Sequence, residues 1–157
     1  MIDVGTTAQH LARALPMDLT CTVITCSILV ATELASRPGV DLIVASGRVR
    51  PGDLAVSGPQ TLSYFSGIYP DLAFLGSGGV HTTAGLTDFY PDEVEVRRAV
   101  IANAGRSFVL VDSSKFGVIG RYHVASLGQL TGFICEASPS ADLRAAIERQ
   151  GSTLLLP

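Results

Sequence analysis

Short runs of β-branched and aliphatic residues alternate along this chain with segments in which apolar side chains recur every three or four positions. Several of the short runs are apolar at consecutive positions, as in residues 108–111. Such runs are typical of parallel strands that are covered on both faces. The pattern predicts strands over residues 2–4, 20–25, 41–45, 73–75, 107–111, 133–135 and 153–156.

The segments with helical spacing carry suitable residues at their ends. Ser27 stands where one helix would begin, Pro91 opens another, and Gly151 follows the last. The predicted helices cover residues 7–15, 28–36, 61–65, 92–104 and 141–150. The alternation of strands and helices predicts one α/β domain, a three-layer α/β/α sandwich with a mostly parallel sheet.

Two long segments interrupt this alternation, residues 46–58 and 76–88, and both are rich in glycine. Loops of this length inside a small domain are usually functional or disordered. Ligands of open α/β sheets bind at the carboxyl ends of the strands. We therefore expect the polar groups that follow predicted strands to meet at one edge of the sheet. These are Thr6, Thr7, Thr25, Ser27, Gly47, the loop from Gly76, Ser113 and Lys115.

Composition excludes several classes of protein. The chain has 157 residues and a net charge of −3, and its basic residues are scattered. A DNA-binding surface usually has clustered basic residues, so the composition disfavours DNA binding by this chain. It has no apolar run of membrane length and no secretory signal, so we expect no membrane contact and a cytoplasmic location. Because the chain begins directly on a predicted strand, we expect it to be a segment of a longer protein.

The cysteines, Cys21, Cys26 and Cys135, are odd in number and form no C-x-x-C pair. Cys21 and Cys26 are five positions apart on or next to a predicted strand, so their side chains should point to opposite faces. We expect buried, reduced thiols. The three histidines are isolated from one another and from the cysteines, so the sequence predicts no metal site.

The most informative motif is Gly5-Thr6-Thr7, between the first predicted strand and the first predicted helix. Glycine permits a sharp turn, and the hydroxyls then stand beside the free N–H groups of a helix N-terminus, where an anion is stabilised. The motif indicates a phosphate site. The structural alternative is a threonine N-cap on an ordinary turn.

Other polar positions have two interpretations as well. Ser27 is a standard helix cap, but Thr25 and the free N–H groups beside it could face the same cleft. The glycines of residues 76–79 match neither nucleotide-binding fingerprint; they form either a structural loop or a backbone cradle for an anion or sugar.

Two charged positions complete the candidate chemistry. Glu93 suits the first turn of its helix and could pair with Arg97 four residues later, or it could bind a ligand. Lys115 follows the most apolar strand and could meet a phosphate, or it could pair with Glu93 or Asp112.

Taken in order, these motifs resemble the C-terminal effector-binding domain of DeoR-type bacterial transcriptional regulators over nearly the whole chain. Cys26 stands where that family has Asn, and Glu136 where it has Asp. The motifs are Asp3-Val4-Gly5-Thr6-Thr7, Thr25-x-Ser27, Gly47 with Val49-Arg50, Phe74-Leu75-Gly76 with Gly78-Gly79, Gly85-Leu86-Thr87, Glu93-Val94-Glu95 and Asp112-Ser113-Ser114-Lys115-Phe116-Gly117.

The resemblance implies a fold like that of sugar-phosphate isomerases and CoA transferases. It implies a sensor, residues 1–157, that binds a phosphorylated sugar or related metabolite and alters operator binding. The DNA would be read by an N-terminal winged helix-turn-helix domain that this chain lacks. The family's members are commonly oligomeric repressors of sugar-catabolism operons.

The predicted site has a phosphate part and a sugar part. Gly5, Thr6, Thr7, Thr25 and Ser27 would hold the phosphate, Lys115 would supply positive charge, and Asp3, Gly47, Gly79, Thr87 and Glu93 would face the sugar hydroxyls. Arg50, His81 and Tyr90 are loop positions that would set specificity.

No catalytic residue, metal or cofactor is assigned in this interpretation. An enzyme resembling a phosphosugar isomerase is the alternative, and Glu93 is its one strong candidate base. A pure dimerisation module is a third hypothesis, which the convergence of polar residues on one cleft disfavours.

Overall fold

The computed structural model describes residues 1–157 as an α/β sandwich around one parallel sheet. The strands are β2 (Val40–Val44), β1 (Cys21–Thr25), β5 (Leu72–Leu75), β8 (Arg106–Val111), β10 (Gly132–Cys135) and β11 (Thr153–Leu155), in that spatial order. Ile2 forms parallel bridges to Thr25 and Phe74 and so joins β1 to β5. Every pairing in this sheet is parallel, which confirms the predicted architecture.

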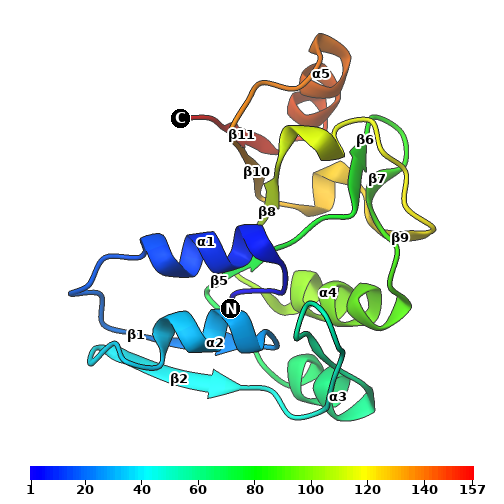
Figure 1. Ribbon diagram of the computed structural model, residues 1–157. Coiled ribbons are helices and arrows are strands. Elements are labelled where there is room, and N and C mark those ends of the chain that lie inside the picture. The colour runs from blue at the N-terminus through cyan, green and yellow to red at the C-terminus, as the bar shows by residue number, and fades with distance from the viewer.

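Helices cover both faces of the sheet (Figure 1). A smaller apolar cluster, which includes Ala8, Ala12, Val30 and Leu34, packs α1 (Thr6–Ala14) and α2 (Ile28–Leu34) on one face. A larger cluster joins the other face to α3 (Pro59–Ser66), α4 (Pro91–Asn103) and α5 (Ala141–Arg149). All five helices were predicted, with bounds that differ by two residues at most.

The segments expected to be loops contain strands. Within residues 76–88, β6 (Gly79–His81) and β7 (Gly85–Asp88) form an antiparallel pair that β9 (Tyr122–Ala125) extends. Within residues 46–58, β3 (Arg48–Val49) pairs with β4 (Val56–Ser57). Glycines and polar residues leave too few apolar positions in these strands for an alternating pattern to be visible in the sequence.

Two further predictions concern the ends of elements and the thiols. Residues 2–4 were predicted as a strand, but only Ile2 forms β-bridges. Cys26 and Cys135 are buried, Cys21 is half-buried, and all three thiols are free.

No helix combines the length and the apolar character that crossing a membrane would require.

Candidate functional site

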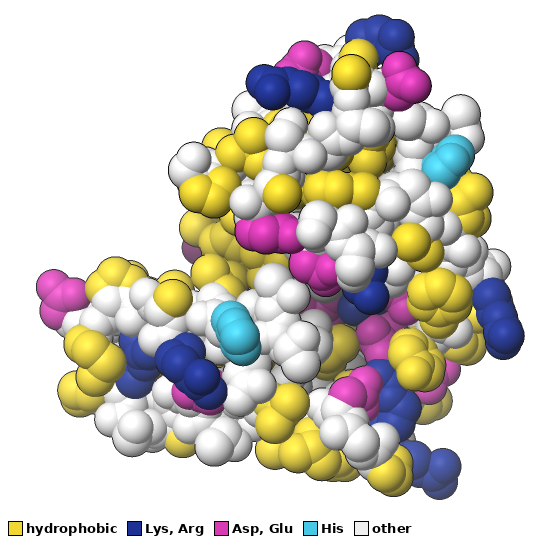
Figure 2. All heavy atoms as spheres, turned by 45° about the horizontal axis from the view of Figure 1, so that its top comes forward, with side chains coloured by type: hydrophobic (Ala, Val, Ile, Leu, Met, Phe, Trp, Pro, Cys, Tyr) yellow, Lys and Arg dark blue, Asp and Glu magenta, His cyan; other side chains and the backbone are white.

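A cavity of about 280 Å³ opens at the carboxyl edge of the parallel sheet. Its wall combines the start of α1, the loop after β5, the turn between β7 and α4, and the loop after β8. Acidic and basic side chains gather in the hollow near the middle of the face in Figure 2. The lining residues are Val4 to Thr7, Asp53, Gly76 to Gly78, Asp88 to Tyr90, Glu93, Arg97, Leu110, Asp112 and Lys115.

One side of the cavity is the N-terminus of α1. Gly5 is the N-cap residue, at φ 109°, which is a conformation that residues with a side chain rarely adopt. No side chain caps the helix, and the hydroxyls of Thr6 and Thr7 are exposed without a hydrogen-bond partner in the protein. Neither threonine is therefore an N-cap, and the first turn of α1, with its unpaired N–H groups, forms part of the cavity lining.

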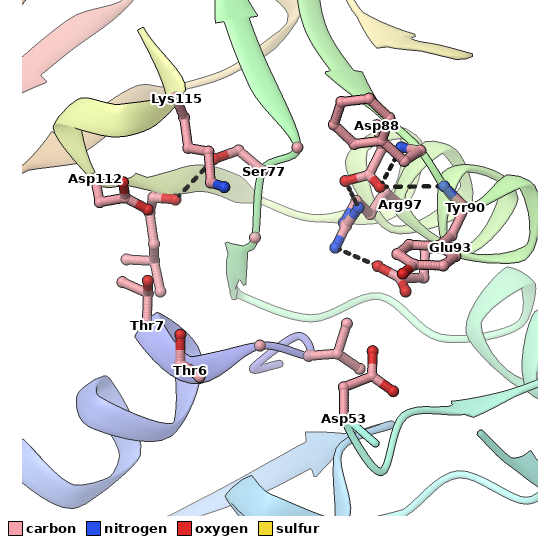
Figure 3. Close-up of a pocket in the computed structure, with 16 residues that line it drawn as sticks. Thr6, Thr7, Asp53, Ser77, Asp88, Tyr90, Glu93, Arg97, Asp112 and Lys115 are labelled. Atoms are coloured by element: carbon pink, nitrogen blue, oxygen red, sulfur yellow. Dashed lines mark hydrogen bonds and ion pairs between the residues drawn. The ribbon is translucent and has the colours of Figure 1, made fainter. Parts of the chain in front are cut away.

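Lys115 lies on the same side, in a 3₁₀ turn (η1, Ser113–Lys115) that directly follows β8. The Asp112 carboxylate, also in the lining, accepts a 3.0 Å hydrogen bond from the Ser114 N–H and so fixes this turn. Lys115 forms no ion pair with the protein. We call Thr6, Thr7 and Lys115 the cationic pole of the cavity (Figure 3).

On the other side, a buried arginine holds three carboxylates. Arg97, only 3% exposed, donates to Asp3 (2.6 Å) and Glu93 (2.8 Å) and also pairs with Asp88. The Glu93 contact is the predicted pair four residues apart. Burial alone would lower the pKa of Arg97, but the charges of the three carboxylates raise it above its usual range. Their charges offset the cost of burying the guanidinium.

Glu93 has a second cationic partner, Arg50, which also pairs with Asp53 and lies 3.9 Å above the centre of the Tyr90 ring. These contacts tie the β3–β4 hairpin to α4 beside the cavity. Burial raises the pKa of the Glu93 carboxyl above its usual value, although the charge of Arg97 acts in the opposite direction. Asp112 lies beside Lys115, and we call the three other lining carboxylates, Asp53, Asp88 and Glu93, the acidic pole (Figure 3).

Five of the predicted ligand residues line the cavity: Gly5, Thr6, Thr7, Glu93 and Lys115. Asp3 is behind the wall, where it accepts hydrogen bonds from Arg97 and from the Gly76 N–H (2.9 Å). Thr25 and Ser27 are fully buried instead of facing the cleft. The Thr25 hydroxyl accepts from the Ser27 N–H (3.0 Å), and the Ser27 hydroxyl caps α2 at Val30 (3.2 Å).

The remaining predicted contacts also lie outside the lining. Gly47 permits close packing, because a Cβ there would lie 2.6 Å from the Ser57 carbonyl oxygen. Gly79 packs on the backbone of Val118 in the same way. The Thr87 hydroxyl donates to the Gly79 carbonyl (3.2 Å) and accepts from the Gly120 N–H (2.8 Å). These groups are engaged by the protein itself.

Of the three specificity positions, Tyr90 lines the cavity and Arg50 supports its acidic pole, while His81 accepts a local hydrogen bond from the Thr83 N–H (3.2 Å). Sequence reasoning missed other residues of the lining, including Asp53, Ser77, Asp88 and Asp112. Asp88 and Asp112 had a signal, since Asp88 directly follows Gly85-Leu86-Thr87 and Asp112 begins the motif that contains Lys115. Arg97 was predicted only as the partner of Glu93. Asp53 had none, because it belongs to a hairpin that was expected to be a loop.

Comparison with known proteins matches residues 1–137 to the model of the DeoR C-terminal sensor domain. The chain belongs to this family. It is 30% identical over 138 residues to the glycerol-3-phosphate regulon repressor of Escherichia coli K12, which covers 88% of this chain and 55% of that protein.

Two other members of the family match over most of this chain. The HTH-type transcriptional regulator GlpR of Haloferax volcanii is 31% identical over 153 residues, 98% of this chain and 60% of that protein. The HTH-type transcriptional repressor GlcR of Bacillus subtilis is 28% identical over 156 residues, 99% of this chain and 60% of that protein. The chain therefore spans only a little over half the length of these curated relatives.

Proposed function

We propose that this chain is the effector-sensing domain of a transcriptional repressor and that it binds a phosphorylated sugar or a related phosphorylated metabolite. One observation supports the proposal most directly. The N-terminus of α1 has no side-chain cap, and two free hydroxyls and an unpaired lysine lie beside it in one cavity. A helix N-terminus carries partial positive charge and free N–H donors, and both favour a phosphate. Lys115 adds a full charge.

The acidic pole suits the rest of such a ligand. An ionised carboxylate can accept hydrogen bonds but cannot donate them, and sugar hydroxyls can donate them. Glu93 and Asp88 are held in place by Arg97, so they offer acceptors without a cost in side-chain entropy at binding. Tyr90 adds an aromatic surface at the mouth of the cavity.

DNA binding would belong to the part of the protein outside this chain, in a winged helix-turn-helix domain. The relatives named above are a regulon repressor and HTH-type regulators, and each is longer than this chain. If the metabolite changes operator affinity by some factor, DNA must change metabolite affinity by the same factor. Assembly into oligomers is part of the same proposal.

Binding without catalysis is the form of the proposal that fits Glu93. An isomerase needs a base free to take a proton from carbon. Both oxygens of Glu93 already accept from arginines, Oε1 from Arg50 and Oε2 from Arg97. The test is deuterium exchange from solvent into bound fructose 6-phosphate, followed by NMR. We expect none; exchange that Glu93→Gln abolishes would make the protein an enzyme.

The binding site is tested by removing hydroxyls from the start of α1. We expect the variant Thr6→Val/Thr7→Val to bind sugar phosphates about tenfold more weakly or worse by calorimetry, since each lost hydrogen bond to a charged group costs about 1.5–3 kcal/mol. The variant Thr20→Val/Thr22→Val is the control, because both of its threonines are exposed and outside the cavity. Equal affinity in the two variants would contradict the proposed phosphate site.

A further inference from the structure

The two poles of the cavity differ in how much charge the protein itself has neutralised. At the cationic pole, Lys115 and the N-terminus of α1 have no anionic partner in the protein other than the nearby Asp112, whose Oδ1 is engaged by Ser114. A ligand can therefore place an anion there and gain a full charge pair.

The acidic pole has an excess of negative charge. Its three carboxylates and the buried Asp3 behind the wall make a cluster of four, which faces two guanidinium groups, Arg50 and Arg97. With every group ionised the cluster carries two negative charges more than positive ones, and with Glu93 protonated it still carries one. No cation at this pole is left for an anionic ligand group.

Both arginines at this pole are already paired with carboxylates of the protein. Arg97 uses its Nε, Nη1 and Nη2 on three different carboxylates, and Arg50 uses its Nε and Nη2 on Asp53 and Glu93. Arg48 and Arg50 line a second groove along the β3–β4 hairpin, and neither is part of the cavity lining. An anion at the acidic pole would therefore meet an excess of carboxylates, and both of the nearby guanidinium groups are already paired with them.

We propose that the cavity accepts ligands with a single phosphate and a hydroxyl-bearing far end, and that it rejects ligands with a second anionic group. The proposal rests on the proposed function, because it assumes that the first phosphate occupies the cationic pole. At about 280 Å³ the cavity is too small for a second anion to lie outside the influence of the acidic pole. Like charges brought together in a desolvated site are strongly disfavoured.

The experiment compares pairs of ligands that share a carbon skeleton. Calorimetry on the protein would measure fructose 6-phosphate against fructose 1,6-bisphosphate, glucose 6-phosphate against glucose 1,6-bisphosphate, and glycerol 3-phosphate against 3-phosphoglycerate. We expect the first member of each pair that binds to be at least about 30-fold tighter than the second. The unphosphorylated sugars measure the contribution of the first phosphate.

The variant Asp53→Asn removes one charge from the acidic pole and keeps the side-chain shape. The gap between the members of a pair is the ratio of their dissociation constants. We expect Asp53→Asn to reduce this ratio by about fivefold or more, because the second anion binds better when the pole carries less negative charge. Asp41→Asn is the matched control, because Asp41 is exposed on β2 and outside the cavity. It should leave the gap unchanged.

The outcomes separate this inference from the proposed function. Equal affinity for both members of a pair, or a gap that Asp53→Asn leaves intact, would overturn the inference while phosphate binding stands. Binding of none of the phosphate esters, or equal binding of the unphosphorylated sugars, would overturn the proposed function and this inference with it.

Discussion

The two ends of α1 are treated in opposite ways. At its C-terminal end the buried guanidinium of Arg37 donates to the carbonyl oxygens of Ala12, Arg13, Leu15 and Pro16. At its N-terminal end, no side chain of the protein meets the free N–H groups. A helix leaves unpaired groups at both ends, so one end here is closed by the protein and the other is open to the cavity.

The other helices begin differently from α1. Ser27 caps α2 and Ser140 caps α5 through hydrogen bonds to main-chain N–H groups. The helices α3 and α4 have no side-chain cap either, but each begins with proline, which removes one of the unpaired N–H groups. The closed end also has the favourable sign of charge, because a cation stabilises a helix C-terminus. We therefore expect the closed end of α1 to contribute to stability and the open end to contribute to the proposed ligand binding.

The largest expected effect comes from opening the closed end. We expect Arg37→Met to lower the free energy of unfolding by about 3 kcal/mol, because buried carbonyl groups lose their donor. Urea denaturation measures this loss. The affinity of the folded variant for a sugar phosphate, measured at low temperature, should stay unchanged.

Arg13 provides the control for that substitution. It lies on the same helix and pairs with Glu33, but its side chain is 62% exposed. Such a surface pair contributes at most about 1 kcal/mol, so Arg13→Met should have a small effect. If Arg37→Met costs no more than Arg13→Met, the closed end is not a stabilising feature and the comparison fails.

Removing the positive charge of Lys115, beside the open end, should lower affinity for the ligand and leave stability unchanged. We expect Lys115→Met to weaken the binding of sugar phosphates about 10- to 100-fold, as the loss of a charge-assisted hydrogen bond implies. Stability should not fall, since Lys115 has no ion pair to lose. Calorimetry and urea denaturation measure the two quantities.

Arg121→Met removes one positive charge from an exposed position outside the cavity and should leave affinity unchanged. A similar loss of affinity in both variants would mean that the net charge of the protein, rather than Lys115, attracts the phosphate.

The contrast between the two ends also marks how far the sequence could be interpreted. The open end was predictable, because glycine, two hydroxyls and a helix start are adjacent in the chain. The closed end was not, since Arg37 and the carbonyls it caps are 21 to 25 residues apart. The Arg97–Asp3 pair spans 94 residues, and no local pattern reports such a contact.

The order of elements was predictable for the same reason as the open end. Apolar runs and helical spacing are local, so the parallel sheet and its helices followed from them. The direction of a side chain at a strand end is not local. Thr25 and Ser27 follow a strand as predicted, yet they turn into the protein to build the start of α2. The β6–β7 pair was hidden by its glycines.

A smaller effect is expected from the turn that opens α1. Gly5 and Gly151 both have a positive φ, 109° and 85°, and a Cβ would meet no atom within 4 Å at either position. Replacing either with alanine should therefore cost similar backbone strain, about 1–2 kcal/mol by thermal or urea denaturation. Only Gly5→Ala should weaken the binding of sugar phosphates, because only Gly5 directs the start of α1. Equal loss of affinity in both variants would contradict this.

The smallest effect concerns the pH dependence of the free energy of unfolding. Its sign should differ between Glu33, which pairs with the last turns of α1, and Glu93, which lies across the cavity from the start of α1. Glu33 accepts hydrogen bonds from Arg13 and Gln9 of α1, and the bond from Arg13 lowers its pKa to about 2. Its contribution to stability is therefore present above pH 4.5 and is lost as the pH falls towards 2. Glu93 lies on α4, across the cavity from the open end of α1, where burial raises its pKa. Its contribution is present below pH 4.5 and is lost as the pH rises through the raised value.

Glutamine variants separate these two contributions from all other titrating groups, since only the difference from the unsubstituted protein is used. The free energy of unfolding without ligand is measured from pH 2 to 8 for the protein, Glu33→Gln and Glu93→Gln. We expect the Glu33→Gln difference to change with pH below 4.5 and the Glu93→Gln difference to change above it, by at most about 1.4 kcal/mol per pH unit for Glu93. A Glu93→Gln difference that changes only below pH 4.5 would mean that the carboxylate is no harder to ionise in the fold than in water. The negative charge of Glu93 would then be as well stabilised by the protein as that of Glu33, and the two carboxylates would not differ in their effect on stability as the pH changes.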